Sequence, residues 1–256
     1  MTAKGGWCSI SQMHVGCRLR GPGAARSALR SFTLFSVFLL ASCANITERR
    51  AETALLQALP RLIGPADNFT ATVQGASGDG SRFEQVQAVG VRVRRANLPV
   101  FDRIEVRLSG VAVDTAAKQV NAVGDARLSL RLKPEDLAAY LGSSEWIDRP
   151  AVRTVAPDRV FLTGRLKIAG IPLGAEASAD LQGRLEARGP QLHLAVDSLS
   201  WQGQTASALI RALVERAINP LFNLAQYAVP ARIDSARVDS DAIVIDASGS
   251  NLVLLN

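Results

Sequence analysis

Few residues of this chain are of the types that carry out enzymatic chemistry. Of its two histidines, only His193 lies beyond the first 42 residues, and Leu192 and Leu194 place it on the polar face of a predicted strand. A histidine in that position is typically solvated. Because the rest of the chain has no second histidine and no free thiol, a Ser-His-Asp triad, a Cys-His pair and a typical zinc site are all disfavoured.

Carboxylates offer another route to catalysis. Glu176, Asp180 and Glu186 share one face of a predicted strand region, but Arg184 and Arg188 lie among them. Interleaved charges of this kind are typical of a solvated surface rather than of a glycosidase or metal site. We therefore predict no catalytic residues, no metal and no cofactor, and a carboxylate-dependent hydrolase is only the weakest alternative.

A local cluster of arginines includes Arg92, Arg94 and Arg95, with Arg103 and Arg107 shortly after them. One interpretation is a solvated strand face. The other is a contact surface for anionic lipid headgroups, to which basic side chains are attracted. Under the second interpretation Arg92, Arg94 and Arg95 are the candidate headgroup contacts.

The charge of the chain is unevenly distributed. The 256 residues include 29 Lys and Arg against 23 Asp and Glu, for a formal net charge of +6. The first 42 residues hold five of the bases and no acid, so that 24 bases and 23 acids remain in the rest. The basic character therefore belongs to the leader and gives no support to nucleic-acid binding. A hydrophobic content of 48% with 20% charged residues also excludes a disordered chain.

Residues 1–42 have the features of an export signal. Arg26 and Arg30 precede the apolar segment 32–40, which is too short to cross a hydrocarbon layer of ~30 Å but suits a signal peptide. The sequence Leu-Ala-Ser-Cys at 40–43 follows at once and resembles the bacterial lipobox. We predict a signal peptide over 1–42, with Met13 as an alternative start, and a tether over 43–50.

The lipobox resemblance implies that Cys43 is acylated, with chains such as palmitate, and anchors the protein to a membrane. An ordinary signal cleaved nearby, or a buried free cysteine, is the alternative. The implied location is the cell envelope, on the periplasmic face. Ala44 after the cysteine resembles the signal for sorting to the outer membrane where a cell has one.

The remainder of the chain predicts an α+β fold in one domain over 51–250. Helical spacing of apolar residues predicts helices at 51–63 and 206–218, and Pro134 followed by two acids predicts a short one through about 141. Period-two alternation predicts strands, which form a long curved antiparallel sheet wrapped around the amphipathic helices. The alternation shifts by one residue at Ser109-Gly110, which predicts a β-bulge there.

The strand region 173–187 carries unusually small residues on its apolar face. They are Ala175, Ala177, Ala179, Gly183 and Ala187. Either the helix 206–218 packs directly against this face, or the small residues leave a cavity. The residues alone do not decide between a solid core and a cavity.

Several stretches together resemble the LmeA-like phospholipid-binding family of exported bacterial proteins, with the YceB-like lipoproteins as a close second. The stretches are Ile104–Asp114, Gly124–Arg131 with Pro134–Leu137, and the ending from Asn219-Pro220-Leu221 through residues 229–233 to Ile243-Val244-Ile245. The resemblance implies an elongated sheet curled around a long helix, with an apolar groove for acyl chains. It supplies no catalytic residues, and the lipobox departs from what many relatives carry.

With this resemblance, we expect a non-enzymatic envelope lipoprotein that binds phospholipid acyl chains for lipid transfer or envelope maintenance. The groove would lie between the helix predicted at 206–218 and the strand region 173–187. Its lining would be Leu209, Ile210, Leu213, Val214, Ala177, Ala179 and Leu181. The alternative is a structural or scaffolding lipoprotein with a solid core that binds another envelope protein. The sequence identifies no protein partner.

Overall fold

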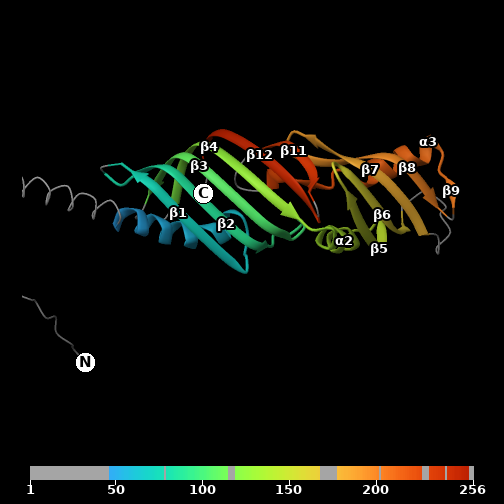
Figure 1. Ribbon diagram of the computed structural model, residues 1–256, viewed down its shortest axis with the longest axis horizontal. Helices are drawn as coiled ribbons and strands as arrows, with labels where there is room; N and C mark the ends of the chain where they lie inside the picture. Colours follow the sequence, from blue (N-terminus) through green and yellow to red (C-terminus); the bar gives the residue numbers. More distant parts are fainter. Residues whose placement is uncertain are drawn as a thin grey trace, which may run out of the picture. The chain divides into compact units, whose positions relative to one another are not determined.

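The computed structural model describes residues 46–77, 79–114, 119–167, 178–201, 203–226, 231–239 and 241–253. All of them belong to one compact unit, which begins at Ala44. They form two antiparallel sheets and a few helices, in agreement with the predicted α+β class (Figure 1). The strands were predicted to form one long sheet, but they are divided between two. The predicted signal peptide and Cys43 lie outside the described residues.

The first sheet, called sheet 1 here, has the strand order β1-β2-β3-β4-β12-β11. Its first four strands form an up-and-down meander, and the last two strands of the chain join it beside β4. The strands are β1 (Asn68–Ala76), β2 (Arg82–Val93), β3 (Phe101–Asp114), β4 (Gln119–Leu132), β11 (Arg232–Asp239) and β12 (Ala242–Val253).

The second sheet, called sheet 2, comes from the middle of the chain and has the order β10-β8-β7-β6-β5, with β9 paired to β8. Its strands are β5 (Ile147–Val155), β6 (Arg159–Leu166), β7 (Ser178–Arg188), β8 (Gln191–Trp201), β9 (Gln204–Thr205) and β10 (Phe222–Asn223). Strand β11 of sheet 1 contacts β7 and β8, so the two sheets meet there.

Alternation of apolar and polar residues gives each sheet one buried face. In β4, Leu128, Leu130 and Leu132 are buried, while Arg127 points to the other face and is exposed. In β7, Ala179, Leu181 and Leu185 are likewise buried. The predicted strand region 173–187 is therefore confirmed from residue 178, and its earlier residues lie outside the described part.

Three α-helices occur among the described residues. The helix over residues 46–62 includes part of the predicted tether and nearly all of the helix predicted at 51–63. α2 (Pro134–Gly142) starts at a proline, with Glu135 and Asp136 in its first turn, as predicted. α3 (Ala208–Ile218) is capped by Ser207, whose hydroxyl accepts from the Ile210 amide at 3.4 Å. A short 3-10 helix, η1 (Leu224–Gln226), follows β10.

The predicted change of faces in β3 occurs, but its cause differs from the prediction. Ile104 and Val106 are buried before the change, and Val111 and Val113 after it. No residue is inserted relative to β2 at this point, because Ser109 and Val111 keep one continuous register with β2. Gly110 instead adopts a φ of 60°, which reverses the faces, and the register with β4 shifts only between Ala112 and Val113.

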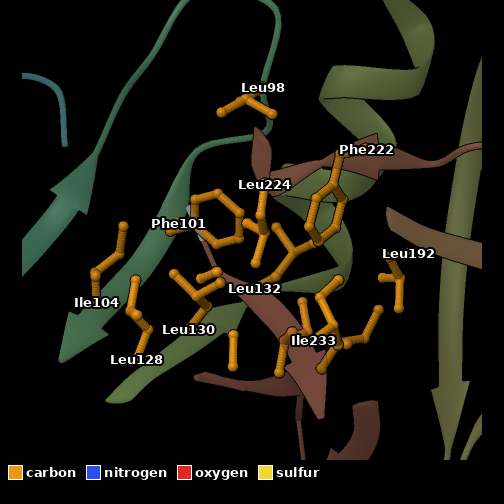
Figure 2. Packing of buried hydrophobic residues seen from close by; sticks show 14 of the residues in the cluster. Leu98, Phe101, Ile104, Leu128, Leu130, Leu132, Leu192, Phe222, Leu224 and Ile233 are labelled. Carbon is orange, nitrogen blue, oxygen red and sulfur yellow. The ribbon is translucent and has the colours of Figure 1, made fainter. Parts of the chain in front are cut away.

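The buried apolar side chains of both sheets form one continuous cluster. Where the sheets meet, the Phe101 ring of β3 contacts the Phe222 ring of β10 edge to face, with centroids 5.7 Å apart (Figure 2). Leu132, Leu192 and Ile233 lie near this pair and belong to the same buried cluster (Figure 2). The apolar interior therefore runs from sheet 1 into sheet 2 without a polar break.

Candidate functional site

α3 lies along an edge of sheet 2, beside the middle of β8, whose ends pair with β10 and β9. Asn219, the residue after the helix, accepts from the Leu194 amide at 2.8 Å and donates to the Leu194 carbonyl at 2.9 Å. Glu215 accepts from the Val196 amide at 3.2 Å. These side chains bind the backbone groups that a neighbouring strand would otherwise bind, and so close the edge.

The apolar stripe of α3 is divided between the interior and the surface. Val214 and Ile218 are buried, and Ile210 is half-buried against the core. Leu209 is 71% exposed and Leu213 is 43% exposed. The expectation that Leu209 and Leu213 face the interior is corrected here: the helix turns a polar side to the β8 backbone, so only the flank of its stripe reaches the core.

The strand residues predicted to line the groove lie inside sheet 2. Ala179 stands between Gly164 of β6 and Trp201 of β8, and Leu181 between Leu162 and Leu199. Ala179 and Leu181 are both buried. Ala177 lies outside the described residues. α3 makes its main contacts with β8, and its Val214 belongs to the same buried cluster as Ala179 and Leu181.

The helix over residues 46–62 treats the edge of sheet 1 in a similar way. Glu52 accepts from the Val73 amide and Glu48 from the Gly75 amide, both at 3.1 Å. Because β1 is the last strand of sheet 1 on this side, the two glutamates cover backbone donors that have no strand partner. A set of apolar residues on the same helix is buried: Ala51, Ala54, Leu55 and Leu59.

The three arginines predicted to contact headgroups each have a partner within the protein. Arg92 adopts a φ of 55° and binds both carboxylate oxygens of Asp136 in α2, at 2.5 and 2.9 Å. Arg94 binds Asp67 at 2.7 Å, and Arg95 donates to the Leu62 carbonyl at 2.8 Å. The geometry thus gives these guanidinium groups structural roles that neither interpretation of the sequence anticipated.

The Arg92–Asp136 pair joins sheet 1 to α2, which packs on β5 of sheet 2. The Asp136 side chain is only 9% exposed and that of Arg92 33%. The hydrogen bond to Asp136 raises the pKa of Arg92 further above its ordinary value. The pair is therefore a charged connection between the two halves of the domain.

A hollow of about 1560 Å³ lies on the polar outer face of sheet 1, opposite the apolar interior. Its lining comes from every strand of sheet 1 and includes three arginines, Arg107, Arg127 and Arg232. Carboxylates, hydroxyls and side-chain amides make up much of the rest. The hollow thus combines charged and polar side chains with apolar ones, and it differs in this from the apolar groove that the family resemblance implies.

Beside the hollow, a row of residues with positive φ crosses sheet 1, and we call this row the crease. Gly75, Gly110 and Asn251 all have positive φ, between 52° and 71°. By the strand registers Gly75 falls opposite Glu84, Glu84 opposite Gly110, and Gly110 opposite Gly124, whose other neighbour is Asn251. The change of faces at Gly110 is visible in the sequence, but only the strand registers show that the crease continues across five strands.

Two titratable groups, one lining the hollow and one in sheet 2, have pKa values below their ordinary values. Burial acts to raise the pKa of Asp246, which lines the hollow, but hydrogen bonds from Arg237, Ser129 and Ser235 outweigh it and hold the pKa below the ordinary value. In sheet 2, partial burial, followed by the nearby Arg188, lowers the pKa of His193. The His193 ring lies 3.0 Å from the Gln191 side-chain oxygen.

Within the described ranges, no cluster of His, Cys, Asp and Glu side chains is arranged to hold a metal ion. None of the helices that the structure describes is both long enough and apolar enough to cross a membrane.

Comparison with known proteins identifies a family. The sequence model of the LmeA-like phospholipid-binding family matches residues 44–248, which is most of the chain. Comparisons with curated proteins and with solved structures gave no match. Because the match spans well over half of the chain, the chain belongs to the LmeA-like phospholipid-binding family.

Proposed function

We propose that this protein is a non-enzymatic lipoprotein of the bacterial cell envelope that binds phospholipid by its acyl chains, for lipid transfer or envelope maintenance. Cys43 tethers it to a membrane. The acyl chains reach the apolar interior at α3. The observation that carries this proposal is the exposed apolar surface of α3, which adjoins the continuous interior of a chain from a phospholipid-binding family.

The attachment of α3 to sheet 2 suits a movable element. The helix buries Val214 and Ile218 and half-buries Ile210, and it is hydrogen-bonded to β8 through the polar side chains of Arg211, Glu215 and Asn219. Burying two such side chains stabilises by about 1.5–3 kcal/mol each, and each hydrogen bond contributes about 0.5–1.5 kcal/mol. An acyl chain that replaces Val214 and Ile218 against the sheet restores the same kind of apolar contact, so their displacement is offset.

Leu209 and Leu213 have a defined part in this proposal. Large apolar side chains exposed side by side at the surface are typical of sites that contact lipid or protein. In α3 both leucines lie next to buried Val214. A lipid acyl chain that contacts Leu209 and Leu213 therefore lies beside the apolar interior of the protein. The two leucines thus form the outer part of the route and Val214 its inner part.

The lipid content of the purified protein tests the proposal. The chain is expressed in a bacterium with its own signal, purified and extracted, and phospholipid per protein is measured by mass spectrometry. We expect bound phospholipid in the wild type and a severalfold loss in the double variant Leu209→Ser, Leu213→Ser. The matched control is Leu56→Ser, because Leu56 is an exposed leucine on the helix over residues 46–62.

Equal lipid in all three proteins would contradict the role of α3. A wild type without any phospholipid, which instead binds an envelope protein through its outer face, would support the scaffolding alternative. The anchor is tested separately: a Cys43→Ser chain should leave the membrane fraction, because acyl chains contribute ~0.8 kcal/mol of membrane affinity per buried CH₂. A Cys43→Ser chain that stays in the membrane after a salt wash would contradict the tether.

A further inference from the structure

Two arginines lie side by side on neighbouring strands of sheet 1, and both line the hollow. Arg107 of β3 stands directly opposite Arg127 of β4. On either side of this pair the same row continues with Gln87 of β2 and Ser248 of β12, and then with Arg232 of β11. Like charges directly opposite each other destabilise a sheet unless something neutralises them.

The protein supplies little neutralisation for this pair. The ion pair of Arg107 is with Glu105, at a distance of 3.8 Å, and its side chain is largely exposed. Arg127 makes no ion pair or hydrogen bond with any residue that the structure describes. Arg232, at the end of the row, is bound to Asp234 at 3.3 Å.

A second pair of opposed arginines in the same strands shows the contrast. Arg103 stands directly opposite Arg131, just as Arg107 does opposite Arg127. Here each arginine has a close acid, because Arg103 binds Glu105 at 2.7 Å and Arg131 binds Asp241. Neither of them lines the hollow. The arginine pair with weak internal partners is therefore the one that lies in the hollow.

One carboxylate of the hollow also lacks an internal partner. Asp234 and Asp246 are bound by Arg232 and Arg237, respectively. Asp125 has no ion pair or side-chain hydrogen bond with the part of the chain that the structure describes. It precedes Arg127 by two residues on β4, so both side chains leave the same face of the strand at a spacing of ~6.6 Å.

From these charges we infer a binding site that the proposed function does not require. The geometry points to a phosphate ester that also carries an ammonium group, the chemistry of an ethanolamine-phosphate headgroup. Arg107 and Arg127, on strands ~4.8 Å apart, hold the phosphate oxygens, and Asp125 holds the ammonium group. Hydroxyls such as Ser109 and Ser248 line the same hollow and can donate to remaining phosphate oxygens.

The site lies on the face of sheet 1 opposite the interior, so it is independent of the acyl-chain route at α3. Two sources can supply this chemistry: the headgroup of a lipid, or the free ester in solution. They differ in the glycerol and acyl chains that follow the phosphate, which allows an experiment to separate them.

Calorimetric titration of the purified full chain at low salt tests the inference. The probes are phosphoethanolamine, glycerol phosphate and the short-chain lipid dihexanoyl-phosphatidylethanolamine. We expect Arg127→Gln to weaken binding of all three by about tenfold or more, the range for a lost hydrogen bond to a charged group. Asp125→Asn should weaken binding of the two amine-bearing probes and leave glycerol phosphate unchanged.

Arg103→Gln is the matched control, because it removes the same charge from the neighbouring strand β3 at a position outside the hollow. Arg127 has an exposed side chain without a described partner, and its replacement removes the repulsion from Arg107, so the variant should unfold at a temperature no lower than that of the wild type. Tighter binding of the short-chain lipid than of phosphoethanolamine would support the site with the lipid headgroup as its source, and the reverse order would support it with the free ester as its source. Absence of binding, equal affinity in wild type and Arg127→Gln, an equal loss in Arg103→Gln, or no effect of Asp125→Asn would overturn the inference.

Discussion

Each sheet has one edge covered by a helix, and the two helices differ in how much apolar surface they bury. The helix over residues 46–62 binds the edge of β1 through two glutamates and also buries a full apolar face, with Leu55 only 4% exposed. α3 binds the edge of β8 through similar polar contacts, but buries only Val214 and Ile218 and leaves Leu209 and Leu213 at the surface.

The difference separates two tasks that edge-covering helices can perform. Both helices satisfy backbone groups that would otherwise template pairing with another chain. Only the first also fixes its sheet by extensive apolar burial, the dominant stabilising contribution in folding. α3 covers its edge with little apolar burial and leaves Leu209 and Leu213 exposed to solvent. We therefore expect sheet 1 to be the stable part and α3 to be the element that opens.

The largest expected effect contrasts one leucine from each helix. Leu55→Ala should lower the free energy of unfolding by about 2–5 kcal/mol, because it removes a buried side chain and leaves a cavity. Leu213→Ala should cost less than about 1 kcal/mol, because that side chain is 43% exposed. Urea unfolding of both variants measures the difference. Equal losses would mean that α3 is packed as tightly as the first helix.

A second prediction concerns the connection between the two halves. Breaking a buried ion pair costs about 3–5 kcal/mol, and the partial exposure of Arg92 reduces this, so Asp136→Ala should cost about 2 kcal/mol. Denaturant unfolding measures the loss. Asp67→Ala is the control, because its pair with Arg94 is half-exposed and should contribute less than about 1 kcal/mol. Similar losses in the free energy of unfolding for the two variants would show that the Arg92–Asp136 pair contributes no more than an exposed ion pair.

The polar attachment of α3 can be broken at one residue. Asn219→Ala leaves the Leu194 amide and carbonyl without their partner, which should cost about 1–3 kcal/mol. Because little apolar burial holds α3, this loss should also speed hydrogen exchange throughout the helix. Glu52→Ala removes the corresponding contact of the first helix and should leave exchange in that helix nearly unchanged. Faster exchange in the first helix instead would reverse the comparison.

The smallest expected effect depends on pH. The pKa of His193 is lowered, chiefly by partial burial, so the unfolded chain binds more protons between the two pKa values. The contribution of His193 to the free energy of unfolding is therefore fully present above the ordinary pKa of 6.5. It is lost as the pH falls from there through the lower pKa of the folded protein. Melting temperatures at pH 7.5 and 5.5 should show a smaller acid-induced loss in His193→Gln than in wild type. An identical loss would show that His193 has no influence on sheet 2.

The extent of what could be predicted from the sequence follows from the range of the interactions. Local patterns were enough for α2, where a proline and two acids mark the start, and for the alternation in β4 and β7. Spacing also predicted the apolar stripe of α3. It could not show which side of the helix meets a neighbour, because Asn219 and Glu215 choose that side by binding the β8 backbone.

The candidate sites required information that no local pattern contains. Arg92 and Asp136 are 44 positions apart, so their pairing depends on how α2 meets sheet 1. Arg107 and Arg127 face each other only through the register of β3 and β4. Alternation placed both arginines on a polar face, but the hollow and the absence of close counter-charges depend on the crease and on several strands together.

Hydrogen exchange of the purified full chain, with and without phospholipid vesicles, tests the central claim most directly. Without lipid, amides in residues 208–218 should exchange faster than those in residues 51–62. Vesicles should slow exchange in 208–218, because lipid covers Leu209 and Leu213, and leave 51–62 unchanged. Exchange that is equally slow in both helices and insensitive to vesicles would contradict the account, because α3 would then be neither the movable element nor the place where lipid meets the protein.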